Sequence, residues 1–349
     1  MDFRKKIRVL VVDDSILFRR VLTTRLPEDS DIEIVGAAVD AFDAKGAILR
    51  LKPDVVTLDV EMPGMSGIEL LNIILPQYPV PVVLVSSLNI SVFEALSAGA
   101  VDFEHKPDMS SPNGVDLFLN ALKRKILVAS VAKVHLTAAK PDVISTSDNA
   151  LLNSPKLRSV VIAIGASTGG TEATLTVLKD MPANSPGTVV VQHMPEGFTA
   201  MYAKRLNGLC PMEVKEAENG DVIERGRILL APGNSHMKVV KIGSSYTVRC
   251  YTAEKVNGHR PSVDVLFDSV AETVGNRGIG VIMTGMGGDG AKGLLNMRKK
   301  GAFTVGQDEK TCVVYGMPKV ARDMGAVEAE APCEGIAETL KRQLEKMAK

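Results

Sequence analysis

The feature that most constrains the fold is the alternation of short apolar runs with helical patterns along most of the chain. Strands alternating with helices at this spacing predict a parallel, doubly wound sheet. At 349 residues the chain is too long for one domain of ordinary size. It is therefore predicted to be an α/β protein with two doubly wound parallel-sheet domains. The predicted strands cover 7–12, 32–37, 54–58, 81–85 and 100–103 in the first half, and 160–164, 187–191, 278–284 and 303–305 in the second.

A segment without sustained periodicity separates the two halves. It is rich in Ser, Asn, Pro and Asp, a composition typical of linkers. We predict a first domain over 1–128, an interdomain linker over 129–156 and a second domain over 157–349. Short alternating segments at 237–242 and 246–251, with Gly243 and Ser244 between them, predict a β-hairpin insertion in the second domain.

Charge and cysteine content exclude several classes of protein. Lys plus Arg equals Asp plus Glu, 41 each, so there is no global basic field to attract nucleic acid or a membrane surface. The four cysteines form no CxxC pair, as expected for reduced thiols. The apolar run after Lys6 ends at Asp13, too soon for a signal peptide, and no stretch approaches the ~20 apolar residues of a membrane helix. We expect a cytoplasmic protein with no membrane insertion.

Polar residues in the first half gather just past the predicted strand ends, where parallel sheets bind ligands. They are Asp13, Asp14, Asp59, Ser86 and Lys106. Clustered carboxylates repel one another, so a hard cation such as Mg²⁺ is expected to balance them. An ammonium and a hydroxyl beside them could stabilise a phosphoryl group carried by one carboxylate. Any one of these residues alone would be a solvated loop residue or a helix cap; five of them at four of the five predicted strand ends favour a site.

The motifs in this region resemble the receiver domain of bacterial two-component response regulators over about residues 5–125. They are VVDDS at 11–15, LDVEMPGMSG at 58–67, VSS at 85–87 and KP at 106–107. The resemblance implies Asp59 as the phosphorylated residue and a histidine kinase as the phosphodonor. It also implies that Asp13, Asp14, Asp59 and the main chain of Glu61 surround Mg²⁺, and that Ser86, Phe103 and Lys106 form the switch.

The second half opens with an apolar strand that runs into Gly165-Ala-Ser-Thr-Gly-Gly170 and then a helical pattern. A serine on such a turn can be a nucleophile or merely a helix cap. Ser167, His193 and Asp289 follow three separate predicted strands, whose carboxyl ends share one sheet edge. A serine, a base and an acid that orients the base are the components of nucleophilic ester cleavage. Backbone amides around Thr168 and in the glycine-rich loop 285–288 could hold an oxyanion.

Residue spacing leaves alternatives open. His236 is a second candidate for the base, and Asp308 a second candidate for the acid. The order Ser, His, Asp differs from that of α/β-hydrolases, which disfavours that fold. A dinucleotide site would need an acid at the end of the next strand, but that strand ends in Gln192-His193.

Further motifs resemble the catalytic domain of chemotaxis receptor methylesterases, the CheB family. They are GASTGG at 165–170, VVVQHMP at 189–195, LAPGNSHM at 230–237, HRPSVDVLF at 259–267, MTGMGGDGAKGL at 283–294 and VYGMP at 314–318. The resemblance implies Ser167, His193 and Asp289 as a catalytic triad and the Met286 amide as an oxyanion donor.

The same resemblance implies a substrate and a form of control. The expected reaction is demethylation of glutamate methyl esters, with deamidation of glutamines, on the cytoplasmic helices of chemoreceptors, without a cofactor for the hydrolysis. Phosphorylation of the receiver is expected to uncover the catalytic cleft. The alternative is a response regulator whose second domain only binds DNA or protein. Such a domain usually carries a basic recognition helix or stripe, and the second half shows only the short run at 298–300.

Overall fold

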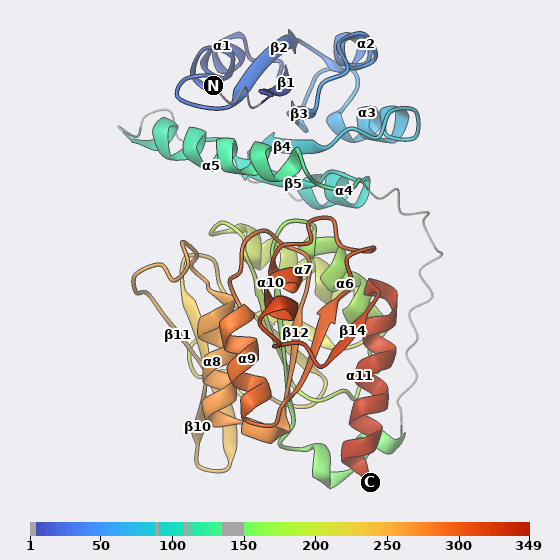
Figure 1. Ribbon diagram of the computed structural model, residues 1–349, viewed down its shortest axis with the longest axis vertical. Helices are drawn as coiled ribbons and strands as arrows, with labels where there is room; N and C mark the ends of the chain where they lie inside the picture. The colour runs from blue at the N-terminus through green and yellow to red at the C-terminus, as the bar shows by residue number, and fades with distance from the viewer. Residues whose placement is uncertain (1–4, 88–90, 108–110, 112, 135–149) are drawn as a thin grey trace. The chain divides into compact units, whose positions relative to one another are not determined.

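The computed structural model describes residues 5–87, 91–107, 111, 113–134 and 150–349. The chain divides into two compact units, Met1–Lys140 and Pro141–Lys349, and each is considered by itself (Figure 1). Most of the predicted linker lies outside the described residues. Its last residues belong to the second unit, since Leu152 is buried and its carbonyl accepts a hydrogen bond from the Arg225 guanidinium.

The first unit is a five-stranded parallel sheet in the order β2-β1-β3-β4-β5. Its strands are β1 Ile7–Val12, β2 Ile32–Ala38, β3 Val55–Leu58, β4 Val82–Ser86 and β5 Asp102–His105. Its helices are α1 Ile16–Arg25, α2 Ala41–Leu51, α3 Gly67–Ile74, α4 Ser91–Ser97 and α5 Gly114–Ala129. The inner strands β1, β3 and β4 are nearly continuous buried apolar runs, as expected where helices cover a parallel sheet. The edge strands β2 and β5 are only partly buried.

Side-chain caps fix where several of these helices begin. The Ser15 hydroxyl accepts from the Phe18 N–H, and the Asp40 carboxylate accepts from the Asp43 N–H. The predicted strand at 100–103 is wrong by two residues. The Ala100 N–H donates to the Ala95 carbonyl, so this apolar residue closes the turn after α4 before the strand begins at Asp102.

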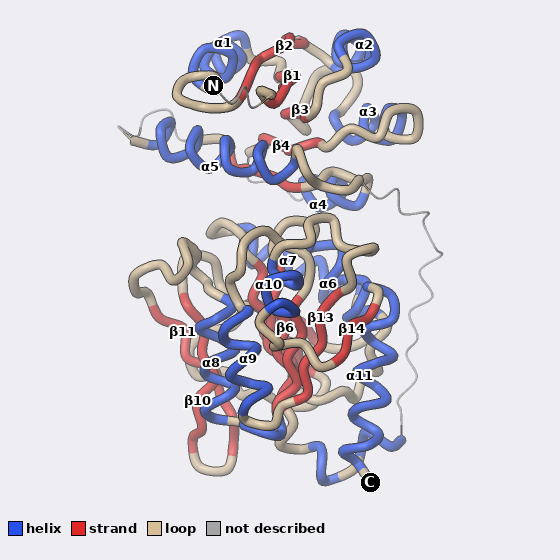
Figure 2. The backbone as a smooth tube through the Cα atoms, in the orientation of Figure 1, coloured by secondary structure: helices blue, strands red, loops and turns tan. Residues whose placement is uncertain are grey.

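The second unit is a seven-stranded parallel sheet in the order β14-β13-β12-β6-β7-β9-β8. The strands are β6 Val161–Ala166, β7 Thr188–Gln192, β8 Glu213–Glu216, β9 Arg227–Leu230, β12 Gly278–Ile282, β13 Phe303–Gln307 and β14 Ala329–Ala331. The helices are α6 Gly170–Lys179, α7 Phe198–Leu209, α8 Val263–Thr273, α9 Ala291–Lys299, α10 Met317–Asp323 and α11 Cys333–Ala348, with short 3-10 turns at Ala150–Asn153, Pro155–Leu157 and Gly275–Arg277. Helix α8 packs against α9, and α6 packs against α11 (Figure 2).

The predicted hairpin is a separate two-stranded antiparallel sheet. Strands β10 (His236–Ile242) and β11 (Ser245–Tyr251) pair with Val239 opposite Val248, and both valines are buried. The hairpin packs on α8, where the Ser269 hydroxyl accepts from the Val239 N–H at 2.9 Å.

In each main sheet the first strand of the unit is an inner strand, and later strands are added on both sides of it. The order of the strands therefore reverses at this first strand. In the first unit, β1 lies between β2 and β3; in the second, β6 lies between β7 and β12. A ligand crevice forms outside the strand ends at such a reversal. The two predicted sites lie at these reversals, after β1 and β3 and after β6 and β12. No helix in the described parts of the chain is long and apolar enough to cross a membrane.

Candidate functional sites

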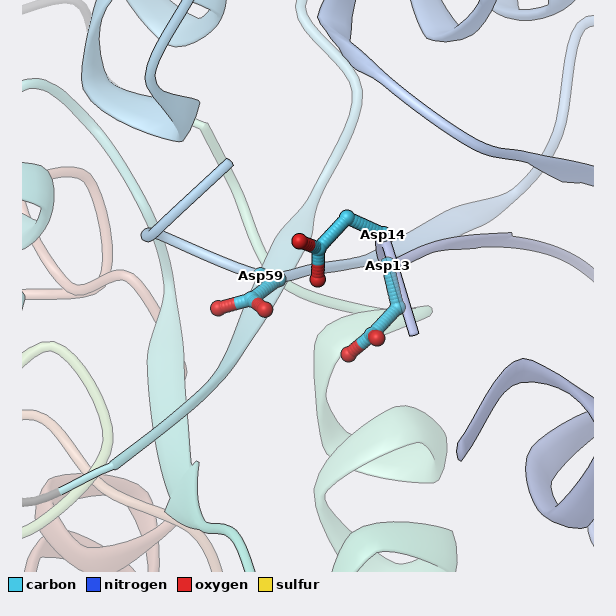
Figure 3. A group of neighbouring side chains, drawn as sticks. All are labelled: Asp13, Asp14 and Asp59. Carbon is cyan, nitrogen blue, oxygen red and sulfur yellow. The ribbon is translucent and has the colours of Figure 1, made fainter. Parts of the chain in front are cut away.

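Three carboxylates lie together at the reversal of the first sheet. Asp13 and Asp14 follow β1, and Asp59 follows β3. Each offers one oxygen, and these oxygens lie within 4.8 Å of one another (Figure 3). Asp13 and Asp59 are buried, whereas Asp14 is exposed. Hard carboxylate oxygens in this number suit Mg²⁺.

Lys106 balances part of the negative charge of this acidic cluster. Its Nζ lies 2.8 Å from Asp13 Oδ2 and 2.6 Å from Asp59 Oδ2. Its main-chain N–H donates to the Ser86 carbonyl at the end of β4, which fixes where the side chain starts. Burial raises the pKa of Asp59, and the hydrogen bond and charge of Lys106 oppose that rise. The Glu61 N–H donates to Asp59 Oδ1 at 3.1 Å, so the main chain of Glu61 borders the cluster.

The other predicted switch residues lie on the neighbouring strands. The Ser86 hydroxyl is buried and has no hydrogen-bond partner among the described residues. Phe103 is buried on β5, with its ring edge-on to Phe93 at 6.4 Å between centroids. The Lys125 ammonium lies 5.1 Å from the centre of the Phe103 ring.

In the second unit, Ser167 lies on a sharp turn between β6 and α6. Its N–H donates to the Thr284 carbonyl at 3.0 Å, which ties the turn to the loop after β12. Gly169 caps α6 with φ +74°, and a Cβ there would lie 2.5 Å from the Cβ of Val313. Glycine is therefore required at this position, and the turn leaves Ser167 just before the first turn of the helix.

Strand pairing puts His193 next to Ser167. Ala166 of β6 pairs with Gln192 of β7, so Ser167 and His193 are the next residues on two neighbouring parallel strands. The His193 N–H donates to the Ala166 carbonyl at 3.0 Å. The buried Gln192 amide nitrogen lies 2.8 Å from the Ser167 carbonyl oxygen and 3.3 Å from that of His193, so it links the two turns.

The His193 ring contacts Asp289, which follows β12. Nε2 lies 2.8 Å from Asp289 Oδ2, and both side chains are nearly buried. The other ring nitrogen, Nδ1, is buried without a hydrogen-bond partner in the described chain. The more familiar arrangement in serine hydrolases has Nδ1 facing the acid and Nε2 facing the serine. Here Nε2 faces the acid instead.

Asp289 is held as a charged carboxylate. It accepts hydrogen bonds from the Ser262 hydroxyl at 2.7 Å, from the Val263 N–H at 2.7 Å and from the Asn257 amide at 2.7 Å. Burial alone would raise the pKa of Asp289, but contact with His193 and these donors holds it well below its ordinary value. The Val263 N–H belongs to the first residue of α8, so the helix N-terminus adds to this effect.

The loop that carries Met286 lies against the serine turn. A Cβ on Gly285 would lie 2.6 Å from the Cβ of Ser167, so the two chains are in contact there. The Thr284 hydroxyl donates to the Thr168 carbonyl at 3.0 Å. Thr168 is buried, whereas the Met286 side chain is half exposed.

The two alternatives that residue spacing left open have other partners. His236 is buried, with Nε2 bonded to the Glu254 carbonyl and Nδ1 accepting from the Ser262 N–H. Asp308 accepts from both the N–H and the hydroxyl of Thr311 in a local turn. Asp289, and not Asp308, is the acid bonded to His193.

Sequence reasoning did not single out four side chains that line this site: Gln192, Asn257, His259 and Ser262. Three of them lie inside the quoted motifs: Gln192 directly before His193, and His259 and Ser262 shortly before the helix α8. A serine preceding a helical pattern is a recognisable N-cap signal, and Ser262 does cap α8. Nothing local in the sequence indicates that the same hydroxyl also binds Asp289.

Two protein families match this chain. The family described as CheB methylesterase matches residues 162–340, and the response regulator receiver domain matches residues 9–111. The chain belongs to the CheB methylesterase family. The predicted family and the two predicted α/β domains are thereby confirmed. The alternative of a purely binding second domain is not supported, because the methylesterase match covers that half.

Similar proteins agree with this assignment. The chain is 53% identical over 336 residues to a protein-glutamate methylesterase/protein-glutamine glutaminase of Syntrophomonas wolfei, covering 96% of this chain and 97% of the relative. It is 46% identical to the protein of that name from Salmonella typhi, covering 92% of each. The solved CheB methylesterase catalytic domain of Thermotoga maritima is 37% identical, with a TM-score of 0.52, and covers 53% of this chain and 98% of that one.

Proposed function

We propose that this CheB-family chain hydrolyses glutamate methyl esters on chemoreceptors, and deamidates glutamines there, with Ser167 as the nucleophile. The observation that carries the proposal is the 2.8 Å contact between His193 and Asp289. His193 lies beside Ser167, because the residues before them, Gln192 and Ala166, pair on neighbouring strands. An ordered serine, a histidine and a carboxylate held ionised are the parts that covalent ester cleavage needs.

In the first half of the reaction, Ser167 Oγ attacks the ester carbonyl carbon. His193 Nδ1, which has no hydrogen-bond partner among the described residues, takes the hydroxyl proton, while Asp289 holds the proton on Nε2. The backbone N–H groups of Thr168 and Met286 stabilise the negative charge that develops on the carbonyl oxygen. When the tetrahedral intermediate collapses, the bond to the methoxy oxygen breaks, and His193 returns its proton to release methanol.

In the second half, His193 removes a proton from water, which attacks the acyl carbon bound to Ser167. Collapse breaks the bond to the serine oxygen and regenerates the Ser167 hydroxyl. The product is a glutamate carboxyl group. With a glutamine substrate, the first collapse releases ammonia in place of methanol, so one site performs both hydrolyses.

The first unit is proposed to control this activity through phosphorylation of Asp59. Asp13, Asp14, Asp59 and the main chain of Glu61 would hold Mg²⁺, and the bound ion would shield the charge of the acceptor and of the incoming phosphoryl group. Lys106 supplies a further positive charge next to Asp59. A phosphoryl group on Asp59 is expected to move the Ser86 and Phe103 side chains and so to uncover the catalytic cleft.

The expected partners follow from these roles. A chemotaxis histidine kinase donates the phosphoryl group, and methyl-accepting chemoreceptors are the substrates, which places the chain in the cytoplasm. Nucleic acid and membrane insertion have no part in the proposed activity.

The proposal is tested by the loss of methyl groups from methylated receptor, with and without a small-molecule phosphodonor. Wild-type chain should release methanol, and Ser167→Ala should release none above the uncatalysed rate. Ester cleavage that survives Ser167→Ala would refute the assignment of the nucleophile.

A further inference from the structure

A tight turn that belongs to no helix or long strand touches both partners of the proposed catalytic pair. Val256 and His259 exchange two backbone hydrogen bonds, at 3.0 and 2.9 Å. The two residues between them, Asn257 and Gly258, have φ of +52° and +81°. This is the Asn-Gly two-residue turn that left-handed backbone angles favour.

The Asn257 side-chain amide donates hydrogen bonds to two carboxylates. Nδ2 lies 2.7 Å from Asp289 Oδ1 and 2.8 Å from Asp264 Oδ2. An amide nitrogen carries two protons, so both are used. Asp264 is itself anchored, since its other oxygen accepts from the Gly293 N–H at 2.7 Å. Asn257 therefore ties Asp289 to a second, fixed carboxylate and offsets the repulsion between the two.

His259 reaches the other partner. Its ring stacks on the His193 ring with centroids 3.8 Å apart and an angle of 5° between the planes. The Asp289 contact fixes where Nε2 of His193 lies but leaves the ring able to tilt about that contact. A flat side chain against one face removes this remaining freedom, which sets the direction in which Nδ1 points.

The turn has no evident role in the hydrophobic core. Asn257 and Gly258 are exposed, and a Cβ on Gly258 would meet nothing within 4 Å. The Asn257 side chain contacts Asp289, and the His259 ring contacts the His193 ring. A residue that is exposed yet bonded to two carboxylates is better explained by the site than by stability of the fold.

We propose that the Val256–His259 turn is a positioning device for the catalytic base, in which Asn257 holds Asp289 and His259 holds the plane of the His193 ring. The inference rests on the proposed function, because it assigns residues that act through His193 and Asp289. Neither side chain takes or gives a proton in the reaction.

The test uses the full-length chain, methylated receptor as substrate, and kcat and KM measured separately. His259→Ala and Asn257→Gly should each lower kcat by about 10²-fold with little change in KM, since a misplaced base affects the chemical step and not binding. His259→Phe keeps a flat ring and should recover most of kcat. Asn257→Asp places a third carboxylate beside two others and should lose at least as much as Asn257→Gly.

A spectroscopic measurement separates positioning from general damage. The proton between His193 and Asp289 should give a downfield imidazole N–H resonance in wild type and in His259→Phe. It should broaden or disappear in His259→Ala and Asn257→Gly. The matched control is Ser244→Gly, which changes the β10–β11 turn of the same unit and should leave both kcat and the resonance unchanged.

The outcomes are distinguishable from failure of the proposed function. If Ser167→Ala is inactive while His259→Ala and Asn257→Gly keep wild-type kcat, the positioning role is wrong and the nucleophile stands. If His259→Phe is as impaired as His259→Ala, the stacking role is overturned. If Ser167→Ala keeps full activity, the proposed function itself is wrong, whatever the turn does.

Discussion

His193 and Asp289 meet through Nε2 and Oδ2 at 2.8 Å, although 96 residues separate them in the chain. The contact leaves Nδ1 of His193 buried and unbonded within the described chain. In the proposed mechanism, that nitrogen accepts the proton of the Ser167 hydroxyl. The tautomer that Asp289 selects therefore decides whether the site has a base.

We expect Asp289→Asn to lower kcat for ester cleavage by about 10⁴-fold, the order seen when a triad acid becomes an amide and the wrong tautomer is favoured. KM should change little. Asp308→Asn is the matched control, because the Asp308 carboxylate accepts hydrogen bonds from the nearby Thr311. Equal losses in the two variants would contradict the role given to Asp289.

The stability of the second unit should depend on pH through the same carboxylate. The pKa of Asp289 is lowered in the folded chain. The contribution of this carboxylate to the free energy of unfolding is therefore complete above the ordinary pKa of about 4, and it is lost as pH falls below that value. Asp289→Asn should cost about 3 kcal/mol at pH 7. The gap between variant and wild type should narrow as pH falls from 5 towards 2 in unfolding experiments. A gap independent of pH would argue against an ionised Asp289.

Removal of Mg²⁺ should abolish control without abolishing catalysis. Chelation, or the substitution Asp59→Asn, is expected to remove stimulation of the esterase by a phosphodonor and to leave the unstimulated rate unchanged. Asp116→Asn is a suitable control, since this exposed carboxylate forms its ion pair with Arg25 at 2.6 Å. Stimulation that persists in Asp59→Asn would show that another residue carries the phosphoryl group.

Gly165→Ala should damage both stability and activity. A Cβ at Gly165 would lie 2.1 Å from Val263 Cγ1, and the Val263 N–H is bonded to Asp289. Overpacking of this kind costs about 1–3 kcal/mol. Gly208→Ala, in the last turn of α7 with nothing within 4 Å of the new Cβ, should be neutral or stabilise by up to about 1 kcal/mol. Thermal unfolding and kcat of the two variants provide the comparison.

Much of this architecture could be predicted because the information is local. Strands followed by polar residues mark the carboxyl edge of a parallel sheet, and this placed Ser167, His193 and Asp289 after β6, β7 and β12. The spacing of the residues did not distinguish Asp289 from Asp308 as the acid, and the family motifs favoured Asp289. The predicted start of the fifth strand at Ala100 is wrong, because Ala100 is apolar but closes the turn after α4.

Other features depend on contacts between distant parts of the chain. Asn257 and His259 lie on a short turn between β11 and α8, and the residues that they contact are set by how α8 and β12 pack. The choice of ring nitrogen on His193 likewise depends on the direction from which Asp289 approaches. The crowding of Gly165 by Val263 cannot be seen before both segments are placed.

The interior position of β6 in its sheet has a consequence during synthesis. Its neighbour β12 is made more than 100 residues later, and Asp289 later still. Domains fold largely in order as the chain emerges from the ribosome. All residues of the acidic cluster, with Lys106, have been made before Ser167 is translated. A growing chain can thus complete the proposed phosphorylation site first, and the proposed catalytic residues are complete only after β12 and Asp289 have been made.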